Sequence, residues 1–554
     1  MAMQDLFRRL VTNLAHPRRG TQAARGVGVA ASSAHASAAA STAAWTAACA
    51  VGIALASAER ASAQFFHFES PHIHPLELTP DGSRLLAVNT VDQRLEVFDV
   101  VGTAPYLVPA GSVVVGVEPI SVRARTSSEA WVVNHMSDSV TVVDLNTMSV
   151  KATLLTGDEP CDVVFAGKLQ RAFVSVSQLN RVEVFDPSNL LAAPSIVNIA
   201  GEDPRGLATD GVRVYAVIAE CGNDTTIVPE TKVSSTVNPY PNDQNPPPNS
   251  GSTFSPPVAA GLPTAPRSGL IVRKDSTGAW KDDNNGNWSS AVTWGLNGND
   301  VAIINANNLA TTYARGFMTS PLAITMAPDG RVVTVGTEAK NEIRFEPNLR
   351  SKFVRVEGAV LPAGGATTVS SRFDLNPHLT YAVPSIPMMQ RLLSVGDPRS
   401  VVVSANGAKA YVTGMGSSNL IAFSMSNFAR LSLANVGEGP TGVVLDAAAA
   451  RLYTLNRFDG SISVVDESSF TQIGTVPFYD PTPNVVKIGR PFVFDTHIAS
   501  GLGQVSCNSC HIDSRMDQLA WDLGDPSGQV KVFNESCNLG LPGQAGACGN
   551  WHPM

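Results

Sequence analysis

Two cysteines and a histidine in the spacing C-x-x-C-H are the part of this sequence best suited to chemistry. They are Cys507, Cys510 and His511, in the stretch CNSCH. Two thiols one helical turn apart can form thioethers with the vinyl groups of haem, and the adjacent imidazole can ligate the iron. A zinc site would need a second C-x-x-C pair, which Cys537 and Cys548 do not form, and a redox dithiol would follow a strand rather than the glycine-rich loop found here. The motif therefore predicts haem c, ahead of zinc and redox chemistry.

A sixth iron ligand has several candidates, because methionine and histidine are both common axial ligands. Met554, in the terminal HPM, is the preferred candidate, and Met516, His552 and His497 are the others. Met516 is only five residues beyond His511 and is expected on the proximal side. For each of them taken singly, a packed or surface position is the commoner role.

The first 63 residues predict an export signal. A long arginine-containing region precedes the apolar run from Ser41 to Ala58, and Ala61-Ser62-Ala63 has the small-residue pattern of a cleavage site. A membrane-anchoring helix is the alternative, but the run is short and rich in small residues. We therefore expect a soluble mature protein in the periplasm or secreted, where disulfides are permitted.

The composition predicts a globular protein and argues against a nucleic-acid partner. The chain has 554 residues, 44% of them hydrophobic and 16% charged, which predicts a globular protein with more than one unit. Its formal charge is −8 and aromatic residues make up 6%, so neither a basic face nor a broad stacking surface for nucleic acid is expected.

A repeat fills the middle of the chain. Each copy has a proline, an alternating strand, a turn, a second strand and a short strand that closes on Asp, and four of the six intervals between copies are 41 to 44 residues. That is the length of one four-stranded propeller blade. The anchoring prolines are Pro75, Pro119, Pro160, Pro204, Pro321, Pro398 and Pro440.

These copies resemble the YVTN family of β-propellers. The closest match to the name motif is Tyr411-Val412-Thr413-Gly414, and other copies keep an Asn at the end of the second strand. The resemblance covers about residues 70 to 475 and implies an all-β, seven-bladed β-propeller over 64–478. Two long intervals are expected to hold insertions, at about 222–318 and 347–393. Propellers host many functions, so this resemblance implies little about activity.

The remaining segment, 479–554, resembles the first haem region of the bacterial di-haem cytochrome c peroxidase and MauG group. The matching residues are Gly489, Arg490, Phe494, Asp495, Ser500, Gly501, Ser506 and Asp517, while His497 departs from the usual small or polar residue. The resemblance implies a short, mainly helical cytochrome c-like segment. The chain has no second C-x-x-C-H, so we expect this segment to be incomplete and peroxidase activity in this chain alone to be doubtful.

Four cysteines remain for disulfides once Cys49 leaves with the signal. Cys537 and Cys548 are expected to close a loop, and Cys161 and Cys221 fall near one rim of the predicted propeller. A rim disulfide between the last two and a pair of inert buried thiols are both consistent with the sequence.

Two further stretches contain residue types that could bind a metal ion. His67, His72 and His74 could hold copper or zinc, but a role where the propeller closes is favoured. The stretch KDDNNGNW from Lys281 has its glycine one place early for a calcium-binding EF-hand, so a polar turn is favoured over calcium.

The leading hypothesis is a periplasmic c-type cytochrome that transfers electrons to or from a redox partner protein or a small carrier. One alternative is a propeller that binds a ligand or protein and carries a vestigial haem segment. Another makes the propeller the catalyst, similar to quinoproteins or nitrite reductases, with electrons passing to the haem. The sequence predicts no oligomeric state.

Overall fold

The computed structural model describes residues 71–229, 232, 249–250, 253–254, 270–282, 285–341, 354–383, 385–515, 517–519 and 521. They belong to one compact unit, His67–Met554. Within these ranges, strands dominate and the few helices are short. None of the helices described is long and apolar enough to cross a membrane.

Seven four-stranded antiparallel sheets make up the main body of the described residues. The first three contain β1 (Leu76–Leu78), β2 (Arg84–Asn89), β3 (Arg94–Val100) and β4 (Leu107–Val114); β5 (Pro119–Thr126), β6 (Glu129–Asn134), β7 (Ser139–Asp144) and β8 (Ser149–Leu155); and β9 (Pro160–Ala166), β10 (Arg171–Val176), β11 (Arg181–Phe185) and β12 (Ser195–Asn198). The fourth contains β13 (Glu202–Thr209), β14 (Arg213–Glu220), β20 (Val301–Asn305) and β21 (Thr311–Ala314).

The last three sheets follow the same order. They contain β22 (Ser320–Met326), β23 (Val332–Ala339), β24 (Val354–Leu361) and β25 (Ser371–Asp374); β26 (Pro398–Val403), β27 (Lys409–Gly414), β28 (Asn419–Ser424) and β29 (Arg430–Asn435); and β30 (Pro440–Asp446), β31 (Arg451–Asn456), β32 (Ser461–Asp466) and β33 (Thr471–Pro477). Smaller sheets join β15 (Thr225–Val228), β18 (Leu270–Lys274) and β19 (Trp280–Lys281), and β16 (Asn249–Ser250) with β17 (Thr253–Phe254).

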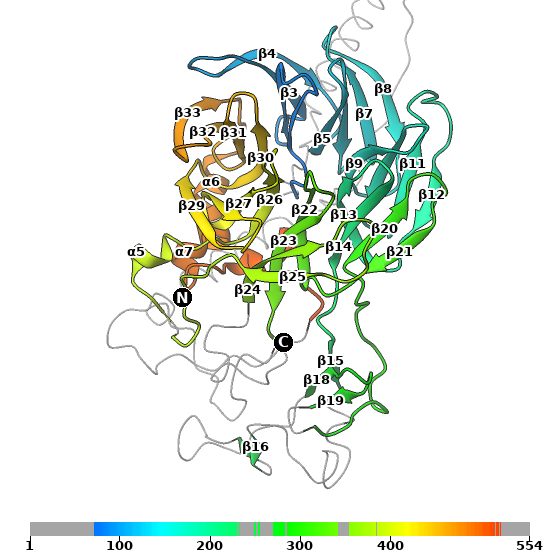
Figure 1. The fold of residues 1–554 in the computed structure, drawn as a ribbon, viewed down its shortest axis with the longest axis vertical. Coiled ribbons are helices and arrows are strands. Elements are labelled where there is room, and N and C mark those ends of the chain that lie inside the picture. Colours follow the sequence, from blue (N-terminus) through cyan, green and yellow to red (C-terminus); the bar gives the residue numbers. More distant parts are fainter. Residues whose placement is uncertain are drawn as a thin grey trace, which may run out of the picture. The chain divides into compact units, whose positions relative to one another are not determined.

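The first strands of successive sheets contact one another around a ring (Figure 1). The contacts run from β1 through β5, β9, β13, β22, β26 and β30, and β30 returns to β1. Each predicted anchoring proline lies in, or directly before, one of these first strands. Apolar side chains of neighbouring sheets interdigitate, as where Leu85 and Phe98 of the first sheet meet Tyr453 and Ile462 of the last.

Buried asparagines at the end of the second strand explain why the repeat keeps this residue. Asn134 donates to the hydroxyls of Ser139 and Thr141, and Asn456 does the same to Ser461 and Ser463. Each amide thereby ties its own turn to the next strand. Buried polar groups need such partners, so the position strongly favours Asn.

The two predicted insertions have different outcomes. β20 and β21, which lie inside the first range, complete the sheet that begins with β13 and β14. The prediction that 347–393 is an insertion is wrong for its first part, because β24 and β25 within it belong to the fifth sheet. Its last part, from Leu375 to Leu393, is mostly turns and carries the short helix α5 (Met388–Arg391).

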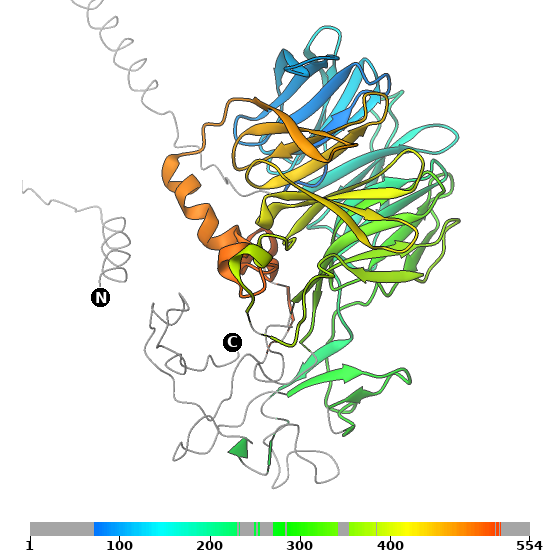
Figure 2. The ribbon, with the colours of Figure 1, turned by 60° about the vertical axis from the view of Figure 1, so that its left-hand side comes forward.

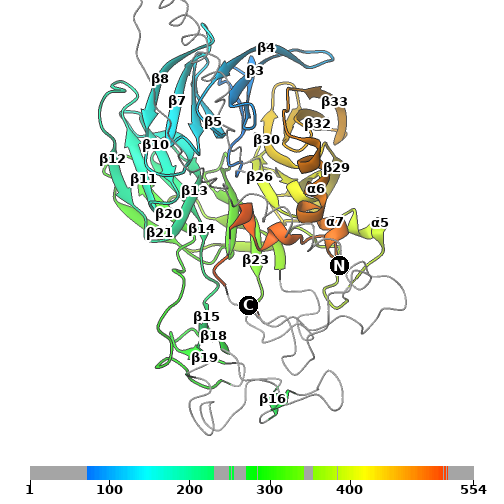
Figure 3. The ribbon, with the colours of Figure 1, turned by 180° about the vertical axis from the view of Figure 1, so that it is seen from behind.

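Helices follow the last sheet and lie on one face of the ring, as the orange ribbon in Figure 2 shows. They are α6 (Asn484–Phe494), α7 (Thr496–Ala499) and the 3₁₀ turns η3 (Cys507–Ser509) and η4 (Ile512–Ser514); a further 3₁₀ turn, η2 (Met415–Ser417), follows β27. Figure 3 shows the C-terminal turns crossing this face from α7 toward β14 and β23. We call residues 495–521 the cap.

Candidate functional site

The C-x-x-C-H stretch forms one tight turn within the cap. Ser506 and Ser509 form a capping box around η3, and the amide of His511 donates to the carbonyl of Cys507 at 3.0 Å. Cys507 and His511 are exposed, Cys510 is half-buried, and both thiols are free. Asn508 and Ser509, between the cysteines, are buried. The turn thus directs two of its three chemical groups to solvent and anchors itself by the residues between them.

Asp397 anchors this turn from the propeller side. Its carboxylate accepts hydrogen bonds from Ser509 Oγ at 2.6 Å, Ser506 Oγ at 3.1 Å and Asn508 Nδ2 at 3.4 Å. Burial raises the pKa of Asp397, against the opposing effects of Arg399 and these donors. The cap therefore places three donors on a carboxylate that would otherwise be buried with few partners.

A second anchor lies two residues beyond His511. Asp513 is buried, and its Oδ2 accepts from Arg205 Nη1 at 2.7 Å and from Arg399 Nη1 at 2.9 Å. Burial alone would raise the pKa of Asp513, but Arg399 and Arg205 outweigh it and hold the pKa well below its usual range. Further along, Arg515 pairs with Glu159. The cap therefore contacts several different sheets at once.

The start of the C-terminal segment is fixed to the last sheets. Lys487 pairs with Asp480 at 2.7 Å, and the Arg490 guanidinium lies 4.7 Å from the centre of the Phe458 ring. Leu502 packs with Leu379 and Tyr381, so the segment after β25 also supports the cap.

The candidate sixth ligands receive no support from the described residues. His497 is buried and its Nε2 is 3.1 Å from the carbonyl of Ser394, which gives this imidazole a structural role. Met516, His552 and Met554 lie outside the described residues.

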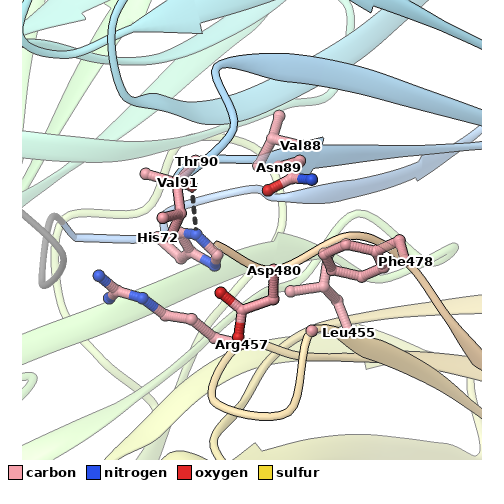
Figure 4. A pocket seen from close by; sticks show the side chains of 10 residues that line it. His72, Val88, Asn89, Thr90, Val91, Leu455, Arg457, Phe478 and Asp480 are labelled. Atoms are coloured by element: carbon pink, nitrogen blue, oxygen red, sulfur yellow. Dashed lines mark hydrogen bonds between the residues drawn. The ribbon is translucent and has the colours of Figure 1, made fainter. Parts of the chain in front are cut away.

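His72 joins the first and last sheets, where the ring closes. Its Nδ1 is 2.8 Å from Thr441 Oγ1 and its Nε2 is 2.6 Å from Thr90 Oγ1. It borders a small pocket between these sheets that Asp480 and Arg457 also line (Figure 4). Burial, followed by the positive charge of Arg457, lowers the pKa of His72 well below its usual value.

At the two candidate metal sites, the described side chains bind other protein groups. His74 pairs with Glu77 at 2.9 Å, His67 lies outside the described residues, and no group of three metal-ligating side chains occurs in the part of the chain described. In the stretch from Lys281, Asp282 accepts hydrogen bonds from the amide of Gly286 at 2.8 Å and from Trp288 Nε1 at 2.9 Å, so its carboxylate stabilises its own turn.

Replacing His72 with glutamine is expected to flatten the dependence of stability on pH. The unfolded chain gains a proton on this imidazole below about pH 6.5, whereas the folded state resists protonation, so acidification favours unfolding. His72→Gln should remove up to about 1.4 kcal/mol per pH unit from the slope of unfolding free energy between about pH 6 and 5. Urea unfolding at several pH values measures this.

Thr441→Val is the matched control, because it removes a hydrogen bond to the same ring but no titratable group. It should lower stability at every pH and keep the slope. Equal slopes for His72→Gln and the unsubstituted protein would contradict the assignment of a neutral, buried imidazole.

Of the two alternatives left open for Cys161 and Cys221, the structure shows separate buried thiols rather than a rim disulfide. Cys161 and Cys221 are both free and buried, Cys161 in a cluster with Ile73 and Ile120. Cys221 follows β14 and donates from its thiol to the carbonyls of Met318 and Thr319, at 3.2 and 3.1 Å. The thiols lie in separate clusters, which explains why the alternative of inert buried thiols holds. Cys537 and Cys548 lie outside the described residues.

Sequence reasoning missed the anchors of the cap. Asp203-Pro204-Arg205 and Asp397-Pro398-Arg399 are two copies of D-P-R at the beginnings of β13 and β26. The other copies of the repeat lack arginine after the proline, and that difference was the available signal.

Comparison with known proteins supports the fold. No protein-family model and no curated protein matches the sequence. Among solved structures, the hydrazine synthase of Kuenenia stuttgartiensis is similar over 74% of this chain and 99% of its own, with 14% identity and a TM-score of 0.50. The fold is a β-propeller. The WD40 repeats of RRP9 are also similar, over 70% of this chain and 87% of their own, with 9% identity and a TM-score of 0.44. At these identities the likeness extends to the fold alone.

Proposed function

We propose that this protein is an exported c-type cytochrome in which a seven-bladed propeller carries one covalently bound haem on its cap. Cys507 and Cys510 would hold the haem by thioethers and His511 would ligate its iron. The observation that carries the proposal is the exposure pattern of the turn: the motif's own Cys507 and His511 face solvent, while Asn508 and Ser509 are buried in the anchor.

The surroundings of the turn fit an apolar macrocycle. Helix α6 contacts η3 and leaves Val485, Ile488 and Phe492 exposed, at spacings of three and four residues along one face. Both thiols are free to react, and burial, with the nearby Asp517 as the next cause, raises the pKa of Cys510 to about 12. That thiol therefore stays protonated until it reacts.

Haem c, when bound, would supply one-electron transfer. The protein's own contribution is position: Asp397 fixes the turn, and the propeller holds His511 at its surface, within reach of a redox partner protein or a small carrier. Electron transfer, rather than peroxidase turnover, is proposed because the chain carries a single C-x-x-C-H motif.

The test is production of the full chain in a host that matures c-type cytochromes. We expect one haem per chain that survives denaturing electrophoresis, together with a reduced-minus-oxidised spectrum typical of a c-type cytochrome. Added peroxide and an electron donor should give little turnover. A folded protein without covalent haem would overturn the proposal and favour the alternative, a binding propeller with a vestigial haem segment.

A further inference from the structure

Two arginines from different sheets meet on one carboxylate beneath the cap. Arg205 belongs to β13 and Arg399 to β26, and the Nη1 atoms of both donate to the same oxygen, Oδ2 of Asp513. All three side chains are at most 5% exposed. The geometry is that of a closed receptor for one carboxylate oxygen.

The propeller side of this pocket has more donors than Asp513 satisfies. Arg205 also pairs with Asp203 at 2.6 Å, so it has two carboxylate partners. Among the described residues, Nε and Nη2 of Arg399 are buried without a hydrogen-bond partner. Leaving charged donors unsatisfied in a buried site is costly, so an anion at this site would gain hydrogen bonds from Arg399 that Asp513 does not accept.

The backbone is left-handed at Asp513 and at the residue that follows it. The φ and ψ of Asp513 are 53° and 40°, and Ser514 follows with a φ of 64°. The left-handed region costs most residues with a side chain roughly 1–2 kcal/mol, but aspartate enters it more readily than most. This turn presents the Asp513 carboxylate to both arginines.

We propose that Arg205 and Arg399, beneath the cap, form a binding site for a carboxylate, and that Asp513 is a resident ligand that a small carboxylate anion can replace. The pocket belongs to the propeller, since both arginines are fixed in its first strands. The cap is then a detachable element held in part by a replaceable ligand. This inference does not depend on attachment of haem.

The experiment is chemical rescue of Asp513→Ala in the full chain by formate. The variant empties the pocket and leaves a space of about the size of the lost carboxylate, so its melting temperature should fall by several degrees. Formate should restore at least about half of that loss in a saturable way, because a ligand that binds only the folded state stabilises it. Sodium chloride at equal ionic strength should not.

Two matched variants define the pocket. Asp513→Asn fills the same space without charge, so it should be destabilised and insensitive to formate. Ser514→Ala, next in the chain and exposed, should behave as the unsubstituted protein does. Rescue should also disappear in Asp513→Ala combined with Arg399→Gln. Equal responses of Asp513→Ala and the unsubstituted protein to formate would overturn the proposal.

A second measurement applies if Asp513→Ala fails to fold. Formate should then speed tryptic cleavage after Arg515 in the unsubstituted protein, relative to chloride, because it competes with Asp513 for the arginines. Equal cleavage rates in formate and chloride would overturn the proposal.

Discussion

Replacing Cys507 and Cys510 together with alanine is expected to abolish covalent haem attachment. Each thioether forms when a thiol adds across one vinyl group, so the double variant has no atom through which to hold the porphyrin. Haem staining after denaturing electrophoresis should fall to background, a loss of at least about a hundredfold, and intact mass should match the bare polypeptide. Each single variant should retain at most one thioether and stain more weakly.

Cys161→Ala is the matched control. Cys161 is also a free thiol, but it is fully buried with Ile73 and Ile120, and burial raises its pKa to about 12. It should leave haem staining unchanged and cost only stability through the small cavity. Full staining of the Cys507/Cys510 double variant would show that haem is held elsewhere or without covalent bonds.

His511→Ala separates attachment from ligation. It should keep the thioethers and hence the stain, while the visible spectrum changes because the iron loses its proximal nitrogen. A spectrum identical to that of the unsubstituted protein would exclude His511 as the ligand.

The repeat could be predicted from the sequence because each copy contains the residues that start, turn and tie its own strands. The proline that opens the first strand, the turn with glycine, as at Gly82, and the asparagine that ties the second strand to the third recur at fixed spacing. Each pattern involves residues close in sequence, so their recurrence at a fixed interval predicted the propeller. The β24 and β25 strands were missed because Gly and Pro residues around them resemble a loop.

The sequence predicted only those residues of the site that are contiguous in the chain. C-x-x-C-H is contiguous, so its residues could be named. The anchors Asp397 and Arg205 lie 110 and more residues away from Cys507 in sequence, and only the ring brings them to the cap. For the same reason the sequence could not decide between a disulfide and two free thiols at Cys161 and Cys221, because two residues near one rim can still lie in different clusters between sheets.

Replacing Asp397 with asparagine is expected to release the cap from the propeller. The amide keeps one acceptor oxygen and gains two donor hydrogens, which face the hydroxyls of Ser506 and Ser509 and the amide of Asn508. Hydrogen bonds to a charged group contribute about 1.5–3 kcal/mol each, so loss of even one should raise local opening at least about tenfold. Backbone amide exchange over residues 500–515 measures this opening.

Asp466→Asn is the control for the chemical change itself. Asp466 ends β32, and among the described residues its carboxylate accepts hydrogen bonds from Ser468 and Ser469 of its own turn. Exchange of 500–515 should stay as in the unsubstituted protein, and exchange in β26 should stay slow in both variants because the propeller remains closed. If Asp397→Asn left the cap protected, the pairing of Asp513 with Arg205 and Arg399 would suffice to hold it. The three donors on Asp397 would then position the C-x-x-C-H turn alone. In that case the substitution would lower the yield of attached haem and leave amide exchange of the cap unchanged.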